Sequence, residues 1–131
     1  MTLLKAAHAL EDKLEATLAD VGLSGPKFSV LNALVAAKEP MALGALADKL
    51  SCVKSNATQM IDRLEADGLV RRVSDPEDRR SVKAELTPSG REHHAAGAEK
   101  IAELEAKFAD AVESEDRSAI ARMLRAIVSP G

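Results

Sequence analysis

The stretch LGALADKLSCVKSNATQMIDRLEADGLVRRVSDPEDRRSVKAELT, residues 43–87, decides the fold of this chain. Its second expected helix carries apolar residues at the i, i+3, i+4 and i+7 spacing of a helix with one buried face, namely Ala57, Met60, Ile61 and Leu64. The same spacing occurs one helix earlier, at Leu43, Leu46, Ala47 and Leu50. Residues 51–53 leave room only for a tight turn between the two. The pattern therefore predicts a helix-turn-helix, whose second helix typically enters the DNA major groove.

The other side of that second helix is unusual in composition. At about 100° per residue, Ser55, Gln59 and Asp62 point away from the apolar stripe. Amide and hydroxyl side chains prevail at its start, and these groups can hydrogen-bond base edges and phosphates. The candidate DNA contacts on this helix are Lys54, Ser55, Asn56, Thr58, Gln59 and Arg63. We expect the two amides to read bases and Lys54 and Arg63 to touch phosphates; a solvated helix face without a partner is the alternative.

A two-stranded hairpin is predicted to follow. Gly68 is suited to end the helix, because it adopts a left-handed conformation at no steric cost. Residues 69–73 and 82–86 have strand character, and Asp75-Pro76 opens the loop between them. The hairpin tip carries arginines, and an arginine in such a position can enter the narrow minor groove. Residues 41–42 are long enough for a minimal third strand.

The runs IDRLEADGLVRR (61–72) and DPEDRRSVKAELTPSG (75–90), in this order, resemble the winged-helix core of the multiple-antibiotic-resistance regulator (MarR) family, and the resemblance extends over nearly the whole chain. It implies that the recognition helix reads the major groove and that Arg80 enters the minor groove. By the same resemblance Asp78 orients Arg80, two residues on, and Arg79 contacts a phosphate. We expect Asp78 to fix the wing by pairing with an arginine and to touch no DNA. Two positions depart from the family pattern. Val53 stands where a Ser or Thr cap is usual, and Gln59 stands where arginine is frequent, so the preferred base is expected to differ.

Composition limits the remaining classes of function. The net charge is −3, but residues 43–91 hold nine Lys/Arg against eight Asp/Glu, so the acidic excess lies in the flanks. With two Phe and no Tyr or Trp, the chain is poorly suited to stacking single-stranded bases. One cysteine excludes an intrachain disulfide, and no apolar run is long enough for a signal peptide or a membrane span. A cytoplasmic protein is expected.

Other chemistries receive little support from the residues. Cys52 lies ahead of a helix N-terminus and Lys54, which could make it a redox sensor; a small buried hydrophobe is the alternative. His8, His93 and His94 have no ligand spacing, because adjacent helical histidines point about 100° apart. Neither a nucleophile–base arrangement nor a glycine-rich phosphate loop is present. We expect no enzyme, no cofactor and no metal.

The flanks are predicted to be helical. Residues 2–21 form an apolar seam. Ser24 and Pro26 open a helix that ends by Pro40. Thr87-Pro88 opens a long helix that reaches about Glu113, and Ser114 caps a last helix. The last stripe consists of Ile120, Met123, Leu124 and Ile127. These stripes exceed what one small core needs, so a two-fold homodimer is expected, with recognition helices about 34–36 Å apart over a pseudo-palindromic site.

The sequence thus predicts a mainly α fold with a small β-hairpin wing. A single domain, 1–131, would comprise a winged helix-turn-helix core at 24–87 and dimerisation helices at 1–22 and 88–131. The expected function is sequence-specific binding of double-stranded DNA by a transcriptional regulator. The resemblance implies a repressor released by a small aromatic or phenolic effector, held between the dimerisation and DNA-binding parts. We expect the first two helices and the long helix to line this pocket. A redox- or metal-sensing regulator of the same fold, or a winged helix that binds only protein, are the alternatives.

Overall fold

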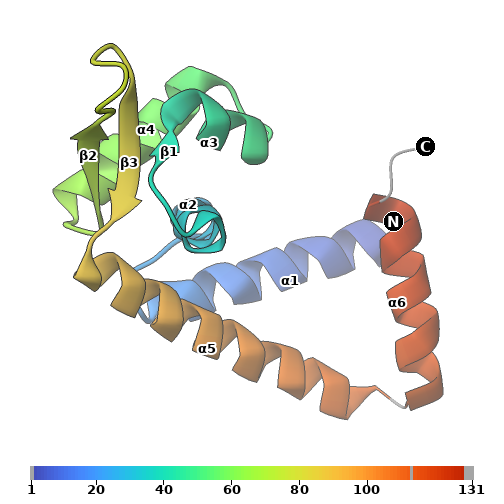
Figure 1. Ribbon diagram of the computed structural model, residues 1–131. Helices are drawn as coiled ribbons and strands as arrows, with labels where there is room; N and C mark the ends of the chain where they lie inside the picture. The colour runs from blue at the N-terminus through green and yellow to red at the C-terminus, as the bar shows by residue number, and fades with distance from the viewer. Residues whose placement is uncertain (1, 113, 129–131) are drawn as a thin grey trace.

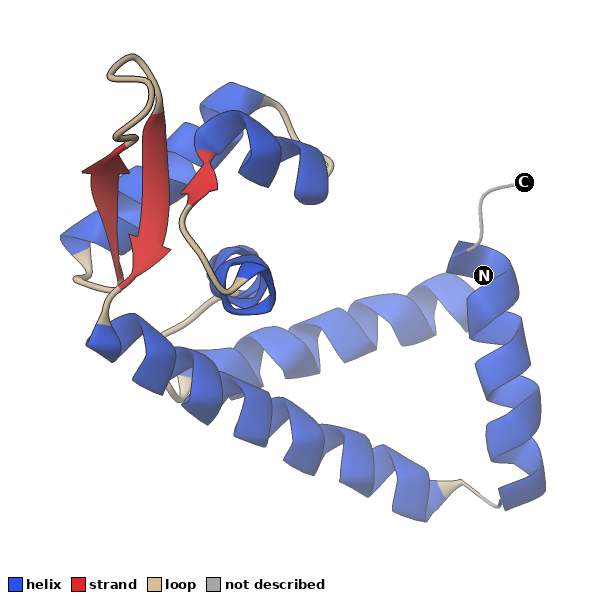
Figure 2. Ribbon diagram, viewed as in Figure 1, coloured by secondary structure: helices blue, strands red, loops and turns tan. Residues whose placement is uncertain are grey.

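The computed structural model describes residues 2–112 and 114–128 of the chain (Figures 1 and 2). Within these residues six helices and three short strands follow one another in the order α1 (Thr2–Ala19), α2 (Gly25–Ala37), β1 (Met41–Ala42), α3 (Leu43–Lys49), α4 (Lys54–Ala66), β2 (Val70–Ser74), β3 (Val82–Leu86), α5 (Pro88–Ala111) and α6 (Ser114–Val128). The predicted fold class, mainly α with a small wing, is confirmed.

The three strands form one antiparallel sheet in the order β1-β3-β2. Val70 pairs with Leu86 at the base of the hairpin, and Ser74 pairs with Val82 near its tip. The expected third strand is present, since Met41 pairs with Ala84 on the other side of β3. The strand β2 therefore lies at an open edge of the sheet, alongside α4.

The core gathers the apolar stripes that the sequence predicted for α3 and α4. Its largest fully buried side chains come from five elements and are Leu18, Val30, Leu31, Leu46, Ile61, Leu64 and Val70. The α4 stripe is buried at Ala57, Ile61 and Leu64, and Met60 is half-buried against the same cluster. Burial of one side of α4 leaves its other side facing outward.

Local capping fixes where the helices begin and end. The Ser24 hydroxyl accepts the Lys27 N–H at 3.3 Å, as expected for the start of α2. After α4, Gly68 has φ +76°, and the Leu69 N–H donates to the Leu64 carbonyl at 2.9 Å. The Gly68 N–H donates to the Glu65 carbonyl at 3.0 Å, which completes a Schellman motif.

The junction between hairpin and long helix is tightly packed. Thr87 caps α5 by accepting the Gly90 N–H at 3.0 Å, and its hydroxyl donates to the Gly68 carbonyl at 2.7 Å. A Cβ placed on Gly90 would lie 1.9 Å from the Leu69 carbonyl oxygen, so only glycine permits this approach. The end of α4 and the start of α5 are thereby joined.

Some predicted boundaries shift. The first helix ends at Ala19 rather than Val21, because the chain turns at Gly22 (φ +74°) and the Leu18 carbonyl accepts the Leu23 N–H. The long helix ends at Ala111, and the predicted end at Glu113 lies outside the described residues. Ser114, expected as a cap, is the first residue of α6; its side chain is also outside the described part.

The terminal helices extend away from the winged part. In Figure 1, α1 and α5 diverge from the core, and α6 lies across their far ends. Only part of the apolar seam predicted for α1 packs against the core of the chain. Leu14 contacts this core, whereas Leu3 and Leu10 are about half exposed. On α6 the whole predicted stripe is exposed, with fractions of 40% to 56% at Ile120, Met123, Leu124 and Ile127.

Candidate nucleic-acid interface

The turn before α4 aims the start of this helix outward. Ser51 adopts the left-handed conformation (φ 54°), and the Cys52 N–H donates to the Ala47 carbonyl at 3.0 Å. Val53 then occupies the N-cap position without any side-chain hydrogen bond, and 62% of it is exposed. As the sequence indicated, the first amides of α4 have no side-chain cap.

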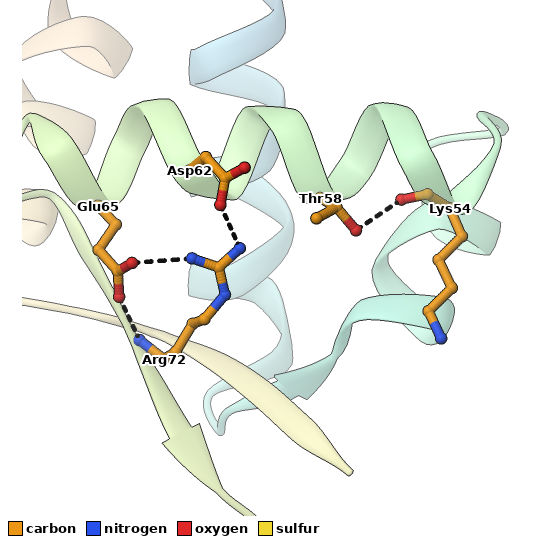
Figure 3. A network of polar contacts seen from close by, with 5 residues as sticks. All are labelled: Lys54, Thr58, Asp62, Glu65 and Arg72. Carbon is orange, nitrogen blue, oxygen red and sulfur yellow. Dashed lines mark hydrogen bonds and ion pairs between the residues drawn. The ribbon is translucent and has the colours of Figure 1, made fainter. Parts of the chain in front are cut away.

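The candidate contacts on α4 lie on its exposed side. Lys54, Ser55, Asn56, Gln59 and Arg63 are all exposed. Thr58 is half-buried, and its hydroxyl donates back to the Lys54 carbonyl at 2.9 Å (Figure 3), which leaves its lone pairs for a donor outside the helix. Five of the six side chains are thus accessible to a partner.

The wing tip is a closed loop with both arginines on its surface. Arg79 and Arg80 are exposed. The Asp75 N–H donates to the Ser81 carbonyl at 3.2 Å, and the Asp78 carboxylate accepts the Arg80 N–H at 3.0 Å. Among the described residues Asp78 has no ion pair with an arginine. The expected side-chain pairing is therefore replaced by an Asx turn, which holds the backbone of Arg80.

The two candidate regions lie at one end of the molecule. Figure 1 shows the start of α4 and the wing tip on the side away from α1, α5 and α6. Within the described residues no carboxylate lies within 4.0 Å of the cationic groups of Lys54, Arg63, Arg79 or Arg80. Their charges are thus available to phosphates.

One charged residue at this site was missed by the sequence analysis. Arg72 on β2 reaches across to α4, where its guanidinium contacts Asp62 at 2.5 Å and Glu65 at 2.8 Å (Figure 3). These contacts, the hydrogen bond to Asp62 foremost, raise the pKa of Arg72 above its ordinary value. Asp62, which the helical projection places beside Gln59, thus also faces the wing. The signal was present: two carboxylates at i and i+3, followed by an arginine pair at the start of a strand.

The other titratable side chains that the sequence pointed to are a cysteine and the histidines. The Cys52 thiol is free and half-buried, and its sensing role stays a prediction. His94 stacks on Phe28, with ring centroids 5.1 Å apart, and its Nε2 lies 3.0 Å from the Asn32 Oδ1. Burial lowers the pKa of His94. Within the described residues no group of three or more His, Cys, Asp or Glu side chains could hold a metal ion.

Comparison with known proteins agrees with this architecture. A profile described as "MarR family" matches residues 23–82. The HTH-type transcriptional regulator YkoM of Bacillus subtilis, itself described as uncharacterized, is 36% identical over 86 residues, which cover 66% of this chain and 52% of YkoM. The chain spans about half the length of the curated relatives it matches most extensively.

Solved structures extend the likeness to nearly the whole chain. The transcriptional repressor CouR, bound to a 23-mer DNA duplex, is 30% identical with a TM-score of 0.85, over 98% of this chain and 90% of CouR. A cysteine-to-serine mutant of MarR from E. coli, complexed with operator DNA, has a TM-score of 0.81 at 21% identity over 98% and 95% of the two chains, which shows the fold alone. The fold is a winged helix-turn-helix with added terminal helices, and the chain belongs to the MarR family.

None of the described helices combines the length and the apolar character needed to cross a membrane.

Proposed function

We propose that this protein is a transcriptional regulator that binds double-stranded DNA in a sequence-specific manner as a homodimer. The observation that carries the proposal is the exposed polar start of α4 beside an arginine-tipped wing, at one end of the molecule. Gln59 and Asn56 would read base edges, because an amide can bond adenine bidentately. Arg80 would enter the minor groove, and Lys54, Arg63 and Arg79 would neutralise phosphates.

The exposed apolar residues of α1 and α6 support the homodimer. Leu124 and Ile127 are about half exposed on α6, and Leu3 and Leu4 are about half exposed on α1. A second copy of the chain would cover these side chains, and a two-fold axis would present two recognition helices to one face of the duplex. The two half-sites would then form a pseudo-palindrome.

A repressor role under the control of an effector is the finer part of the proposal. An open hollow of about 300 Å³ is lined by Val21, Glu92, His93 and Ala96, beside the turn that joins α1 to α2 and along α5. The predicted pocket would be lined by the first two helices and the long helix; of these the hollow includes α5, Val21 lies just beyond α1, and none of its lining residues comes from α2. A small aromatic or phenolic effector bound there would shift the recognition helices and release the DNA. A regulator of this kind would act in the cytoplasm.

Selection of duplexes from a random pool tests the proposal directly. We expect a two-fold symmetric consensus, and the selected duplex then serves for titrations. Arg80→Ala and Gln59→Ala should each weaken binding by about 5- to 150-fold, the cost of about 1–3 kcal/mol for a lost specific contact. The affinity should fall steeply with added salt.

Two control measurements accompany these titrations. Arg91→Ala removes an exposed positive charge outside the proposed interface and should leave the affinity nearly unchanged. Failure of both interface variants to weaken binding, together with a flat salt dependence, would favour a winged helix that binds only protein.

A further inference from the structure

Arg72 is held by α4 through both its main chain and its side chain. Glu65 accepts the Arg72 backbone N–H at 3.1 Å through one oxygen and the guanidinium at 2.8 Å through the other. The second terminal nitrogen of the guanidinium contacts Asp62 at 2.5 Å. We call these three residues the Arg72 clasp; Figure 3 shows all three contacts between β2 and α4.

The clasp occupies a particular position in the hairpin. The base of the hairpin is fixed by burial of Val70 and Leu86. Beyond Arg72, no residue of the wing up to Val82 hydrogen-bonds or ion-pairs with α4 in the described part of the chain. The clasp is therefore the polar tie to α4 that lies nearest to the tip.

On the helix, the clasp lies one turn from a proposed base-reading residue. Asp62 follows Gln59 by three residues, so the two side chains are neighbours on the helix surface. The exposed start of α4 and the clasp consequently share a rigid element, whereas the arginines at positions 79 and 80 belong to a loop. The angle between helix and wing decides whether both can reach their grooves together.

We infer that Arg72 is a positioning residue: by tying β2 to Asp62 and Glu65, it fixes the wing relative to α4 so that both enter the duplex at once. This inference rests on the proposed DNA-binding function. With the angle fixed, binding of α4 makes the wing contact intramolecular, and its effective concentration is high. With the tie broken, the wing explores other angles and Arg80 contributes less.

The chemistry of the clasp requires an arginine. A guanidinium has a planar fork that can donate to two carboxylates at once, and it remains charged at any physiological pH. A lysine ammonium is a compact point charge that does not reproduce this fork. Because the Arg72 guanidinium already binds the two carboxylates, we do not count Arg72 among the proposed phosphate contacts.

The first test compares two neighbouring arginines by titration with the selected duplex. Arg72→Met breaks the clasp, whereas Arg71→Met removes the same charge from the adjacent residue, which pairs with Glu85 inside the hairpin and not with α4. We expect Arg72→Met to weaken binding by about 10- to 30-fold, within the range of coupling between contacting residues, and Arg71→Met by about 3-fold or less. Arg72→Lys should recover only part of the loss.

The second test separates positioning from electrostatics. The double variant Asp62→Ala/Glu65→Ala raises the net charge by two and keeps Arg72. If charge alone mattered, this variant would bind DNA more tightly, because repulsion of the phosphates is reduced. The positioning role predicts weaker binding instead, by about 5- to 20-fold for a coupling of the usual size. Tighter or unchanged binding would overturn the inference.

A double-mutant cycle between Arg72→Met and Arg80→Ala is the third test. In the intact protein Arg80→Ala should cost about tenfold or more, and in the Arg72→Met background about threefold or less, since coupled residues are not additive. Full multiplication of the two effects would contradict the inference. Thermal melts and titrations of the active fraction correct for any folding defect. The Asp62→Ala/Glu65→Ala variant breaks the same clasp from the side of α4 and therefore tests it independently.

The outcomes distinguish this inference from the proposed function. If the wild-type protein selects no duplex, the proposed function fails. If the wild type binds and Arg72→Met binds equally well, with the full Arg80 effect retained, only the positioning role fails.

Discussion

The two ends of this protein have opposite surfaces. At the winged end, α4 buries its apolar stripe and exposes amides, hydroxyls and cations. At the other end, α6 leaves its apolar stripe exposed, with Ile127 at 56% and Leu124 at 51%. A helix whose apolar stripe is buried within its own chain presents a polar surface, which suits a partner such as DNA. A helix whose apolar stripe is exposed is stabilised when a second apolar surface covers it. The proposed DNA-reading surface and the proposed assembly surface thus lie at opposite ends of the molecule.

The largest effect should come from placing charge on the assembly surface. Leu124→Glu/Ile127→Glu introduces carboxylates into the proposed dimer contact, where burial of an unpaired charge is prohibitive. We expect the mass measured by sedimentation to halve at micromolar concentration and the affinity for a two-half-site duplex to fall by about 100-fold or more, as avidity is lost.

A matched control for this change lies on the same helix. Ser118→Glu adds charge at an exposed polar position and should leave both the mass and the affinity unchanged. If the double variant sediments like the wild type, the apolar stripe of α6 has another role.

The next largest effect, on the free energy of unfolding, is expected at the packed junction between the hairpin and α5. Gly90→Ala would force a methyl group against the Leu69 carbonyl, so we expect the free energy of unfolding to fall by about 2 kcal/mol or more, as for overpacked sites. Gly44→Ala, in a helix with nothing within 4 Å of the added Cβ, should instead be stabilising by about 0.5–1 kcal/mol. Urea denaturation measures both, and equal effects would contradict the close packing at the joint.

A smaller gain is expected at the start of the reading helix. Val53 has extended N-cap geometry (φ −75°, ψ 152°) but cannot accept a hydrogen bond. Val53→Ser supplies an acceptor for the first amides of α4 and should stabilise the protein by about 0.5–1 kcal/mol in the same denaturation experiment. Val53→Ala, which supplies none, is the control and should give no such gain.

The smallest effect concerns pH at the contact between α2 and α5. Burial lowers the pKa of His94 in the folded state, so the unfolded chain binds more protons below its ordinary pKa of about 6.5. Stability from this group is therefore complete above pH 6.5 and is lost as the pH falls toward the folded-state pKa. Melts of His94→Gln should depend less on pH between 7 and 5 than wild-type melts. An unchanged pH dependence would count against this assignment.

Sequence reasoning succeeded where the physics is local. The α4 stripe, the Ser24 and Thr87 caps and the stop at Gly68 depend on residues within one or two turns, so periodicity and cap chemistry were sufficient. It missed the Arg72 clasp because the partners meet only after the hairpin folds back on α4. For Asp78 the sequence predicted a side-chain pair with an arginine, whereas its carboxylate accepts the backbone N–H of Arg80, a local contact of the kind Asp side chains commonly make. The exposure of the α6 stripe was expected from a surplus of apolar residues.

The most direct test of the reading surface is a map of backbone amide shifts by NMR on adding the selected duplex. The account predicts the largest changes at residues 54–59 and 79–80, with residues 116–128 of α6 little affected. Changes concentrated on α1 and α6, with the start of α4 and the wing tip unmoved, would contradict it.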